Sequence, residues 1–418
     1  LPGRVQMSKN RVVIIGGGAA GLMAASRARL HADEVTVIER NRICGRKLRI
    51  TGKGRCNITN IADTDEIMDN ITSNRKFMYS ALGAFSNYDV IALMEDLGVA
   101  TKVERGGRVF PVSDSAKDVA DALWRAASGK NVRYITAKAL AIEASDGKVR
   151  AVRYEGGRVE ADSVILATGG KSYPLTGSDG SGYAICAALG HTIVEPKPSL
   201  VPLVCREKFC AELMGLTLKN VELTVLENGK KIYSDFGELL FTHFGISGPI
   251  VLSASAHMRN FGKSDYEMRI DLKHALDEKQ LDARILRDFG EEGKKHLINA
   301  MDKLLPKAII PVIIKRAGVP AHKAAGQLTH GERQKICRAM KSFALTVVKT
   351  RPIDEAIITA GGVRCSEINP STMESKIVGG LYFAGEIIDV DAYTGGYNLQ
   401  IAFSTGYLAG ESAGARNE

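Results

Sequence analysis

Residues 12–39 carry the sequence VVIIGGGAAGLMAASRARLHADEVTVIE, which decides the fold. The run Val12–Ile15 is short and fully apolar, as in a parallel strand that is buried on both faces. The segment GGGAAG follows at 16–21 and leads into a stretch rich in helix formers. A second β-rich run ends at Glu39. A glycine-rich turn between a strand and a helix, with an acid at the end of the next strand, predicts a dinucleotide site rather than an incidental turn.

Each glycine of this loop has an expected role. Gly16 permits a tight turn, Gly18 lets the backbone approach a pyrophosphate, and Gly21 lets the helix pack closely on the strand. The free N–H groups and the positive dipole at the start of the helix that follows, over Leu22–Leu30, are expected to face the bound anion. The carboxylate of Glu39 can accept hydrogen bonds from a ribose 2′-OH.

Composition indicates an ordinary globular protein. The chain has 418 residues, enough for two or three domains, with 45% hydrophobic and 25% charged residues. No apolar run approaches the roughly 20 residues that span a bilayer. The seven cysteines are scattered without a CxxC pair. We therefore expect no metal site, reduced thiols and a cytoplasmic location.

The net charge of +9 raises the question of a nucleic-acid partner. Most basic residues are interleaved with acids along the chain. The one dense basic cluster (Arg46, Lys47, Arg49, Lys53, Arg55) follows the dinucleotide motif, where an anionic cofactor would use it. We therefore expect a small-molecule substrate and no nucleic acid. The oligomeric state is not predicted.

The rest of the chain indicates a split first domain with an insertion. We expect a cofactor domain over 7–190 and 351–418, interrupted at 191–350 by a substrate domain that is β-rich to 275 and helical from 276. Helical periodicity marks 75–98, and an amphipathic helix at 115–128 places Trp124 in the core. Runs at 132–142, 149–154 and 159–164 predict a small β-meander. Helical, charged sequence covers 278–345.

Three distant segments end a strand with glycine, at 16–21, 167–170 and 385–396. One N-terminal fingerprint with a late strand, an acid and a final helix is the layout of FAD domains. The start of that helix would stabilise negative charge on a reduced flavin. No second GxGxxG motif with a downstream acid exists, so a separate nicotinamide-binding domain is not expected.

Seven segments together resemble the bacterial flavoprotein family called BaiN or YhiN, which includes aminoacetone oxidase-like members. The matching segments are IIGGGAAGLMAA (14–25), GRKLRITGKGRCNITN (45–60), GGRVFPVS (106–113), ILATGG (165–170), FTHFGISGP (241–249), ITAGGV (358–363) and LYFAGEIIDVDAYTGGYNLQIAFSTG (381–406). Ala392 departs from the glycine expected there in this family.

The resemblance implies an α/β fold: a Rossmann-like FAD domain of glutathione-reductase type with an inserted β-rich domain and a helical subdomain. It assigns FAD contacts to Gly16, Gly18, Ala20, Gly21, Glu39, Arg40, Lys47, Gly54, Arg55, Asn57, Gly169, Gly385, Glu386, Asn398 and Leu399. Ala19, Ala167, Thr168 and Gly396 join this predicted set because they lie in the same segments. Cys56 joins it too, although a small buried apolar role competes.

Three activities follow as hypotheses. The first is a reductase in which FAD takes hydride from NADH or NADPH and passes it to a conjugated enone, such as a 3-oxo-Δ4 bile acid or steroid. Tyr393 and His243 are the candidate catalytic residues, because such a reaction needs a carbonyl donor and a proton source. The second is an amine oxidase that uses oxygen. The third is an RNA-modifying flavoprotein. Flavin binding without turnover is the fallback.

Overall fold

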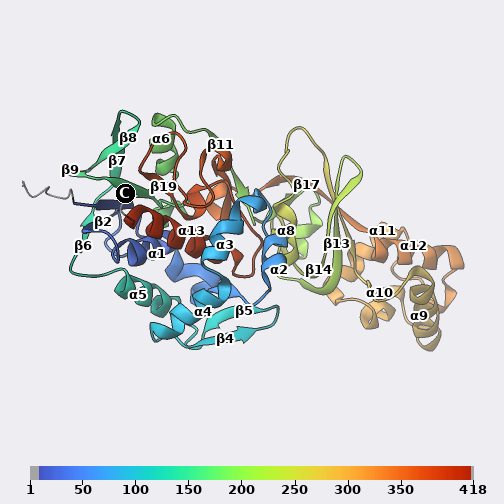
Figure 1. Ribbon diagram of the computed structural model, residues 1–418. Coiled ribbons are helices and arrows are strands. Elements are labelled where there is room, and N and C mark those ends of the chain that lie inside the picture. The colour runs from blue at the N-terminus through green and yellow to red at the C-terminus, as the bar shows by residue number, and fades with distance from the viewer. Residues whose placement is uncertain (1–8, 416–418) are drawn as a thin grey trace, which may run out of the picture. The chain divides into compact units, whose positions relative to one another are not determined.

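The structure is a computed structural model that describes residues 9–415, so the predicted domain start at residue 7 lies outside the described residues. The chain divides into two compact units. Unit 1 comprises Leu1–Ser199 and Ile353–Glu418, and unit 2 comprises Leu200–Pro352. Figure 1 shows the ribbon, coloured along the chain.

A five-stranded parallel sheet forms the centre of unit 1. Its strand order is β19-β10-β1-β2-β6. The bounds are β1 Arg11–Ile15, β2 Glu34–Glu39, β6 Val132–Thr136, β10 Ser163–Leu166 and β19 Leu381–Phe383. The predicted strand at 12–15 is therefore confirmed, and its side chains are buried as a two-sided parallel strand requires.

The first and last helices pack against each other in unit 1 (Figure 1). Helix α1 spans Ala19–Ala28 and α13 spans Tyr397–Gly414. Glycines allow this close approach, because a Cβ at Gly406 or Gly410 would overlap a carbonyl oxygen of α1. The sequence therefore brings its N-terminal and C-terminal segments together beside the same sheet.

Four local predictions in unit 1 are wrong. The run predicted as one strand at 159–164 contains the end of the strand Gly157–Glu160 and the start of β10, which joins the parallel sheet. The run 132–142 is two strands, because β6 joins the parallel sheet and β7 (Ala139–Ser145) starts the antiparallel meander with β8 (Lys148–Tyr154) and β9 (Gly157–Glu160). The helix predicted over 75–98 breaks at Phe85, where Ser86 forms a capping box with Asp89 and starts a new helix. Trp124 is 45% exposed instead of buried.

The remaining elements of unit 1 are short or peripheral. Strand β11 pairs antiparallel with β18, and β5 lies between β3 and β4. Their bounds, with the helices, are α2 Thr64–Asp69, α3 Tyr79–Ala84, α4 Asn87–Asp96, α5 Ala116–Ala126, α6 Ser181–Ala188, β3 Thr59–Asn60, β4 Thr101–Glu104, β5 Arg108–Pro111, β11 Ile193–Ser199 and β18 Ile358–Val363.

Unit 2 is a closed barrel with helices. The strand order is β12-β15-β14-β13-β16-β17. The bounds are β12 Leu203–Cys205, β13 Thr217–Glu227, β14 Lys230–Thr242, β15 Gly245–Ser247, β16 Tyr266–Asp271, β17 Phe343–Thr350, α7 Phe209–Glu212, α8 Pro249–Ser255, α9 Glu278–Glu291, α10 Leu297–Ala300, α11 Ile310–Ala317 and α12 His330–Lys341. The helix expected to continue to 345 is wrong at its end, because Phe343 begins strand β17.

The described part of the chain contains no helix that is long and apolar enough to cross a membrane.

Candidate functional site

A large cavity lies in unit 1 at the carboxyl ends of the parallel strands. The space among its lining residues, open solvent included, is about 1350 Å³. Helices α1, α6 and α13 all begin at this cavity, so three sets of free N–H groups and three positive dipole ends face it. The lining includes these predicted residues: Gly16, Gly18, Ala19, Ala20, Glu39, Arg40, Lys47, Ala167, Thr168, Gly169, Gly385, Glu386, Asn398 and Leu399.

The glycine loop has the geometry that its three roles require. Gly16 has φ +104°, a left-handed conformation that favours glycine. Gly21 does not line the cavity. Glycine is needed there because a Cβ would overlap the carbonyl oxygen of Gly16. A Cβ at Gly18 would meet nothing within 4 Å and would project into open space. The structure therefore leaves room at Gly18 for a ligand.

Glu39 closes the loop from the end of β2. Its Oε2 accepts a hydrogen bond from the Gly17 N–H at 2.7 Å. Its Oε1 accepts one from the Asn41 N–H at 2.8 Å. The carboxylate is thus fixed at the strand end with lone pairs left for the hydroxyls of a ribose.

An ion pair joins two predicted cofactor residues in the cavity wall. Lys47 Nζ lies 2.6 Å from Glu386 Oε2 and also donates to Ser172 Oγ at 2.7 Å. Glu386 Oε1 accepts from the Thr359 N–H at 2.9 Å and from Ser172 Oγ at 3.0 Å. This network holds four distant segments of unit 1 around the cavity.

Arg40 and Asp179 form a second ion pair at the cavity. Partial burial would raise the pKa of Asp179, but hydrogen bonds from Ser181 and Arg40 outweigh it and lower the pKa to about 2. Asn41 Nδ2 donates to the Thr176 carbonyl at 2.9 Å in the same wall.

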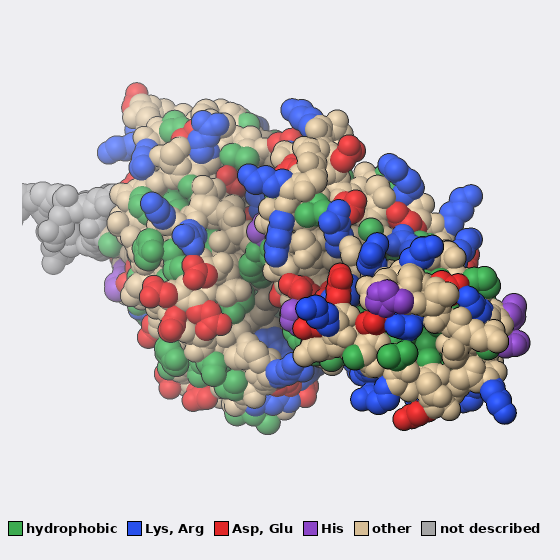
Figure 2. Space-filling model, turned by 90° about the vertical axis from the view of Figure 1, so that its right-hand side faces the viewer, with side chains coloured by type: hydrophobic (Ala, Val, Ile, Leu, Met, Phe, Trp, Pro, Cys, Tyr) green, Lys and Arg blue, Asp and Glu red, His purple; other side chains and the backbone are tan. Residues whose placement is uncertain are grey.

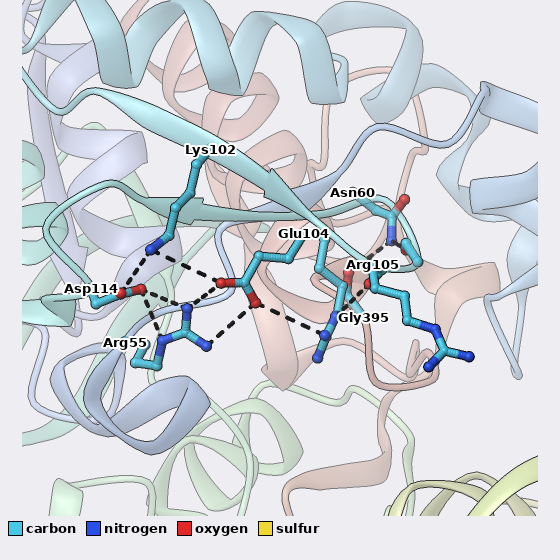
Figure 3. A network of polar contacts seen from close by, with 9 residues as sticks. Arg55, Asn60, Lys102, Glu104, Arg105, Asp114 and Gly395 are labelled. Carbon is cyan, nitrogen blue, oxygen red and sulfur yellow. Dashed lines mark hydrogen bonds and ion pairs between the residues drawn. The ribbon is translucent and has the colours of Figure 1, made fainter. Parts of the chain in front are cut away.

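The segment at 54–57 lies beside the cavity lining rather than in it. Figure 3 shows Arg55 held by Asp114 and Glu104, and its guanidinium lies 4.3 Å from the centre of the Phe110 ring. Gly54 has φ +85°. Cys56 is fully buried, and burial raises the pKa of its thiol to about 12. These contacts show how Arg55 anchors the segment, and its predicted role in binding FAD stays a prediction.

The start of α13 is fixed by contacts to the β3 strand. A Cβ at Gly396 would overlap the backbone of Thr59, and Thr59 Oγ1 donates to Gln400 Oε1 at 2.6 Å. Asn60 Nδ2 donates to the Gly395 carbonyl at 3.1 Å (Figure 3). The helix start that lines the cavity is thus positioned by residues more than 330 positions earlier.

Asn398 shapes the loop that precedes α13. Its Oδ1 accepts from the Ala392 N–H at 3.0 Å, and its Nδ2 donates to the carbonyls of Ala392 at 2.7 Å and Tyr393 at 3.2 Å. Ala392 is fully buried and is not among the residues with positive φ, so alanine adopts this position without backbone strain. Tyr393 itself is half-buried and lies outside the cavity lining.

Buried hydroxyl groups in the cavity wall test whether the site fits a polar cofactor. Thr168 Oγ1 and Ser178 Oγ are buried without a hydrogen-bond partner among the described residues. Both residues line the cavity. Unpartnered buried hydroxyls are costly, so their presence in this wall fits a ligand with hydrogen-bonding groups. The residues present therefore fit FAD.

The chain matches the family described as HI0933-like protein Rossmann domain over residues 10–412. The chain belongs to this family. A 3-dehydro-bile acid delta(4,6)-reductase of Clostridium scindens is 33% identical over 414 residues, which cover 97% of this chain and 100% of the relative. A ribosomal RNA dihydrouridine synthase of Haemophilus influenzae is 32% identical, over 96% of this chain and 97% of the relative.

The family assignment confirms the expected Rossmann-type FAD-binding fold and a flavin-dependent oxidoreductase. A solved 3-ketosteroid delta1-dehydrogenase of Sterolibacterium denitrificans shares this fold. Its TM-score is 0.50 at 12% identity, over 97% of this chain and 99% of that chain. The predicted resemblance to the BaiN or YhiN flavoproteins is thereby confirmed.

Several cavity residues were not predicted as cofactor contacts from the sequence. They are Asn41, Gly45, Leu48, Thr51, Ala137, Lys138, Ala139, Thr176, Gly177, Ser178, Ser181 and Val390, among others. Arg46 also lines the cavity, as its place in the predicted basic cluster suggests. The segment TGSDGSG at 176–182 carried a usable signal, because it is a second glycine-rich turn before a helix. The loop 137–139 carried none, because alanine and lysine have no turn signature.

His243 belongs to unit 2, where it lies exposed at the turn between β14 and β15. Its predicted catalytic role stays a prediction.

One group of potential metal ligands occurs in unit 2. Glu222, Asp271 and His274 offer ligand atoms within 4.8 Å of one another. Protein partners already engage them, because Lys341 Nζ lies 2.5 Å from Asp271 and His274 Nδ1 lies 3.0 Å from Glu222.

Proposed function

We propose that this protein is an FAD-dependent reductase that uses NADH or NADPH to add hydrogen across a C=C bond conjugated to a carbonyl. The cavity of unit 1 carries the proposal, because its helix starts, its open Gly18 and its unpartnered hydroxyls fit FAD. The names of two relatives support the reaction class. Dihydrouridine forms when the C5=C6 bond of uracil, conjugated to the C4 carbonyl, is reduced, and a delta(4,6)-reductase acts on the same kind of bond.

Bound FAD would supply the group that accepts hydride from the nicotinamide and passes it to the substrate. Reduction places negative charge on the substrate carbonyl oxygen and requires a proton at the α-carbon. We assign these tasks to Tyr393 and His243, as expected from the sequence. The place of Tyr393 in its loop supports this role. Its carbonyl accepts a hydrogen bond from Asn398, and Asn398 lines the cavity.

The charge of the two units favours uracil in RNA as the substrate. Unit 2 contains 25 lysine and arginine residues against 17 aspartate and glutamate residues, so it carries +8 of the net +9 charge. The expectation of no nucleic acid considered the charges along the whole chain and did not compare the two units. An excess of basic residues that is confined to one unit is typical of proteins that bind polyanions. A bile acid, with one carboxylate, requires no such excess.

A product analysis separates these substrates. The purified holoenzyme is incubated with NADPH and either ribosomal RNA from a strain that lacks the gene or a 3-oxo-Δ4,6 bile acid. We expect dihydrouridine in the digested RNA by mass spectrometry and an unchanged steroid. A reduced steroid with unmodified RNA would replace RNA with the bile-acid substrate and keep the reaction class. If neither product forms and aminoacetone is oxidised instead, the reductase proposal is wrong.

The cysteines support a reducing compartment. All seven thiols are free in the structure, and such a set is typical of cytoplasmic proteins. We therefore place the protein in the cytoplasm, where both RNA and reduced nicotinamide are present.

A further inference from the structure

The turn between β14 and β15 carries an aromatic and cationic surface on unit 2. Its aromatic members are His243 and Phe244, whose ring centres lie 4.9 Å apart in an edge-to-face arrangement. The guanidinium of Arg351 lies 4.7 Å from the centre of the Phe244 ring. An imidazole, a phenyl ring and a guanidinium therefore lie against one another on unit 2.

Two further cations flank this group of planar side chains. The Cys205 N–H donates to the Phe244 carbonyl at 3.1 Å, so the next residue, Arg206, follows directly beside the turn. In the barrel register Val204 is opposite both Lys349 and Gly245. Leu203, the neighbour of Val204, is buried, so Val204 and Lys349 face the outside of the barrel. We call these five residues (Arg206, His243, Phe244, Lys349 and Arg351) the hairpin-tip surface.

The hairpin-tip surface is available to a partner. Arg206, His243 and Lys349 are exposed, and Phe244 and Arg351 are half-buried. Neither Arg206 nor Lys349 has an acidic partner within ion-pair distance among the described residues, although unit 2 contains many ion pairs elsewhere. Figure 2 shows many lysine and arginine side chains on the face that is turned toward the viewer.

These features match the chemistry of single-stranded nucleic acid. Bases stack on aromatic rings and on guanidinium planes, and phosphates are neutralised by lysine and arginine. A steroid would use an apolar face but not the flanking cations. We propose that the hairpin-tip surface binds a single-stranded RNA segment, with bases stacked at Phe244 and Arg351 and phosphates held by Arg206 and Lys349. This inference rests on the proposed RNA substrate and names the surface that receives it.

The test measures binding of a fluorescein-labelled, uridine-containing 12-nucleotide RNA by anisotropy at several salt concentrations. The double variant R206A/K349A should lose about tenfold or more in affinity, and its salt slope should fall by roughly two, because two phosphate contacts are lost. The variant F244L keeps an apolar side chain but not the ring, and it should lose roughly 5–100-fold, the range of stacking one base.

A matched pair controls for net charge. Lys279 and Lys294 are exposed on unit 2 and also have no acidic partner among the described residues, so K279A/K294A removes the same charge elsewhere. It should bind RNA within about threefold of the unsubstituted protein. FAD content and melting temperature show that each variant is folded.

The outcomes separate the two proposals. If the unsubstituted protein binds the RNA and forms dihydrouridine while F244L and R206A/K349A bind equally well, the hairpin-tip surface is wrong and the RNA substrate stands. If the unsubstituted protein neither binds RNA nor forms dihydrouridine, the RNA substrate is wrong and the surface falls with it. Equal losses in R206A/K349A and K279A/K294A also contradict the surface, because the attraction would then be non-specific.

Discussion

Lys47 and Glu386 are separated by 339 positions in the chain, yet Nζ of Lys47 lies 2.6 Å from Oε2 of Glu386 in the wall of the cavity. The pair joins the loop after β2 to the strand end after β19. Both residues line the same cavity, so the ion pair that joins these distant segments also shapes the cavity wall.

Replacing Lys47 with methionine should destabilise the protein. Hydrogen bonds to charged groups contribute about 1.5–3 kcal/mol, and Glu386 would keep only its bonds to Ser172 and Thr359. We expect the melting temperature to fall by roughly 3–8 °C. The exposed Lys130 provides the control, because K130M should melt within about 1 °C of the unsubstituted protein. Equal melting of K47M and K130M would show that the pair contributes nothing.

Two alanine substitutions in the glycine loop should have different effects, one on folding and the other on FAD binding. G21A places a methyl group on the carbonyl oxygen of Gly16, so it should fold poorly with or without FAD. G18A adds a methyl group to open space at φ −79°, so it should fold normally and lose FAD. Circular dichroism and flavin absorbance of the purified variants measure both effects. A G18A protein that retains its full flavin content would contradict the cofactor site.

The Thr168 hydroxyl should contribute to FAD affinity and not to the stability of the flavin-free protein. This hydroxyl is buried without a partner among the described residues, so T168V should leave the stability of the flavin-free protein within about 0.5 kcal/mol. FAD affinity should fall about 5–10-fold, because one hydrogen bond is lost. T168S keeps the hydroxyl and should bind FAD nearly as well. The test is titration of flavin fluorescence, and unchanged affinity of T168V would exclude a contact.

Asp179 should make stability depend on pH in a defined window. Its folded pKa of about 2 lies below the ordinary value of 3.8, so its contribution is complete above about pH 4 and is lost as the pH falls through about 2. D179N cannot titrate. Urea unfolding at pH 5, 4 and 3 should therefore show a stability difference between the two proteins that shrinks with acid. A difference that is constant across this range would contradict the assigned pKa.

The sequence was sufficient for the parts of the fold that local patterns encode. The apolar run at 12–15, the glycine loop and Glu39 lie where their chemistry predicts, because strand, turn and strand end are set by neighbouring residues. The break after Phe85 was also encoded, since Ser86 and Asp89 form a capping box, but the apolar periodicity on both sides concealed it.

Other features depend on partners that are distant in sequence. The run 132–142 contains no turn residue, and only pairing with β2 and β8 divides it. Phe343, Leu345 and Val347 are buried and alternate with less buried side chains, as in a strand, but this segment follows the charged helix α12 directly. Trp124 lies outside because the apolar side of α5 is filled by alanine, valine and leucine. The pairing of Lys47 with Glu386 has no local signature.

A single anaerobic turnover of the holoenzyme tests whether this protein reduces conjugated C=C bonds. The flavin is first bleached with one equivalent of NADPH, and unmodified ribosomal RNA is then added while the visible absorbance is followed. We expect the absorbance to return and about one dihydrouridine to form for each flavin that is reoxidised. If the flavin stays bleached with RNA and with a 3-oxo-Δ4,6 bile acid, and oxygen alone restores its absorbance, this protein is not a reductase of conjugated C=C bonds.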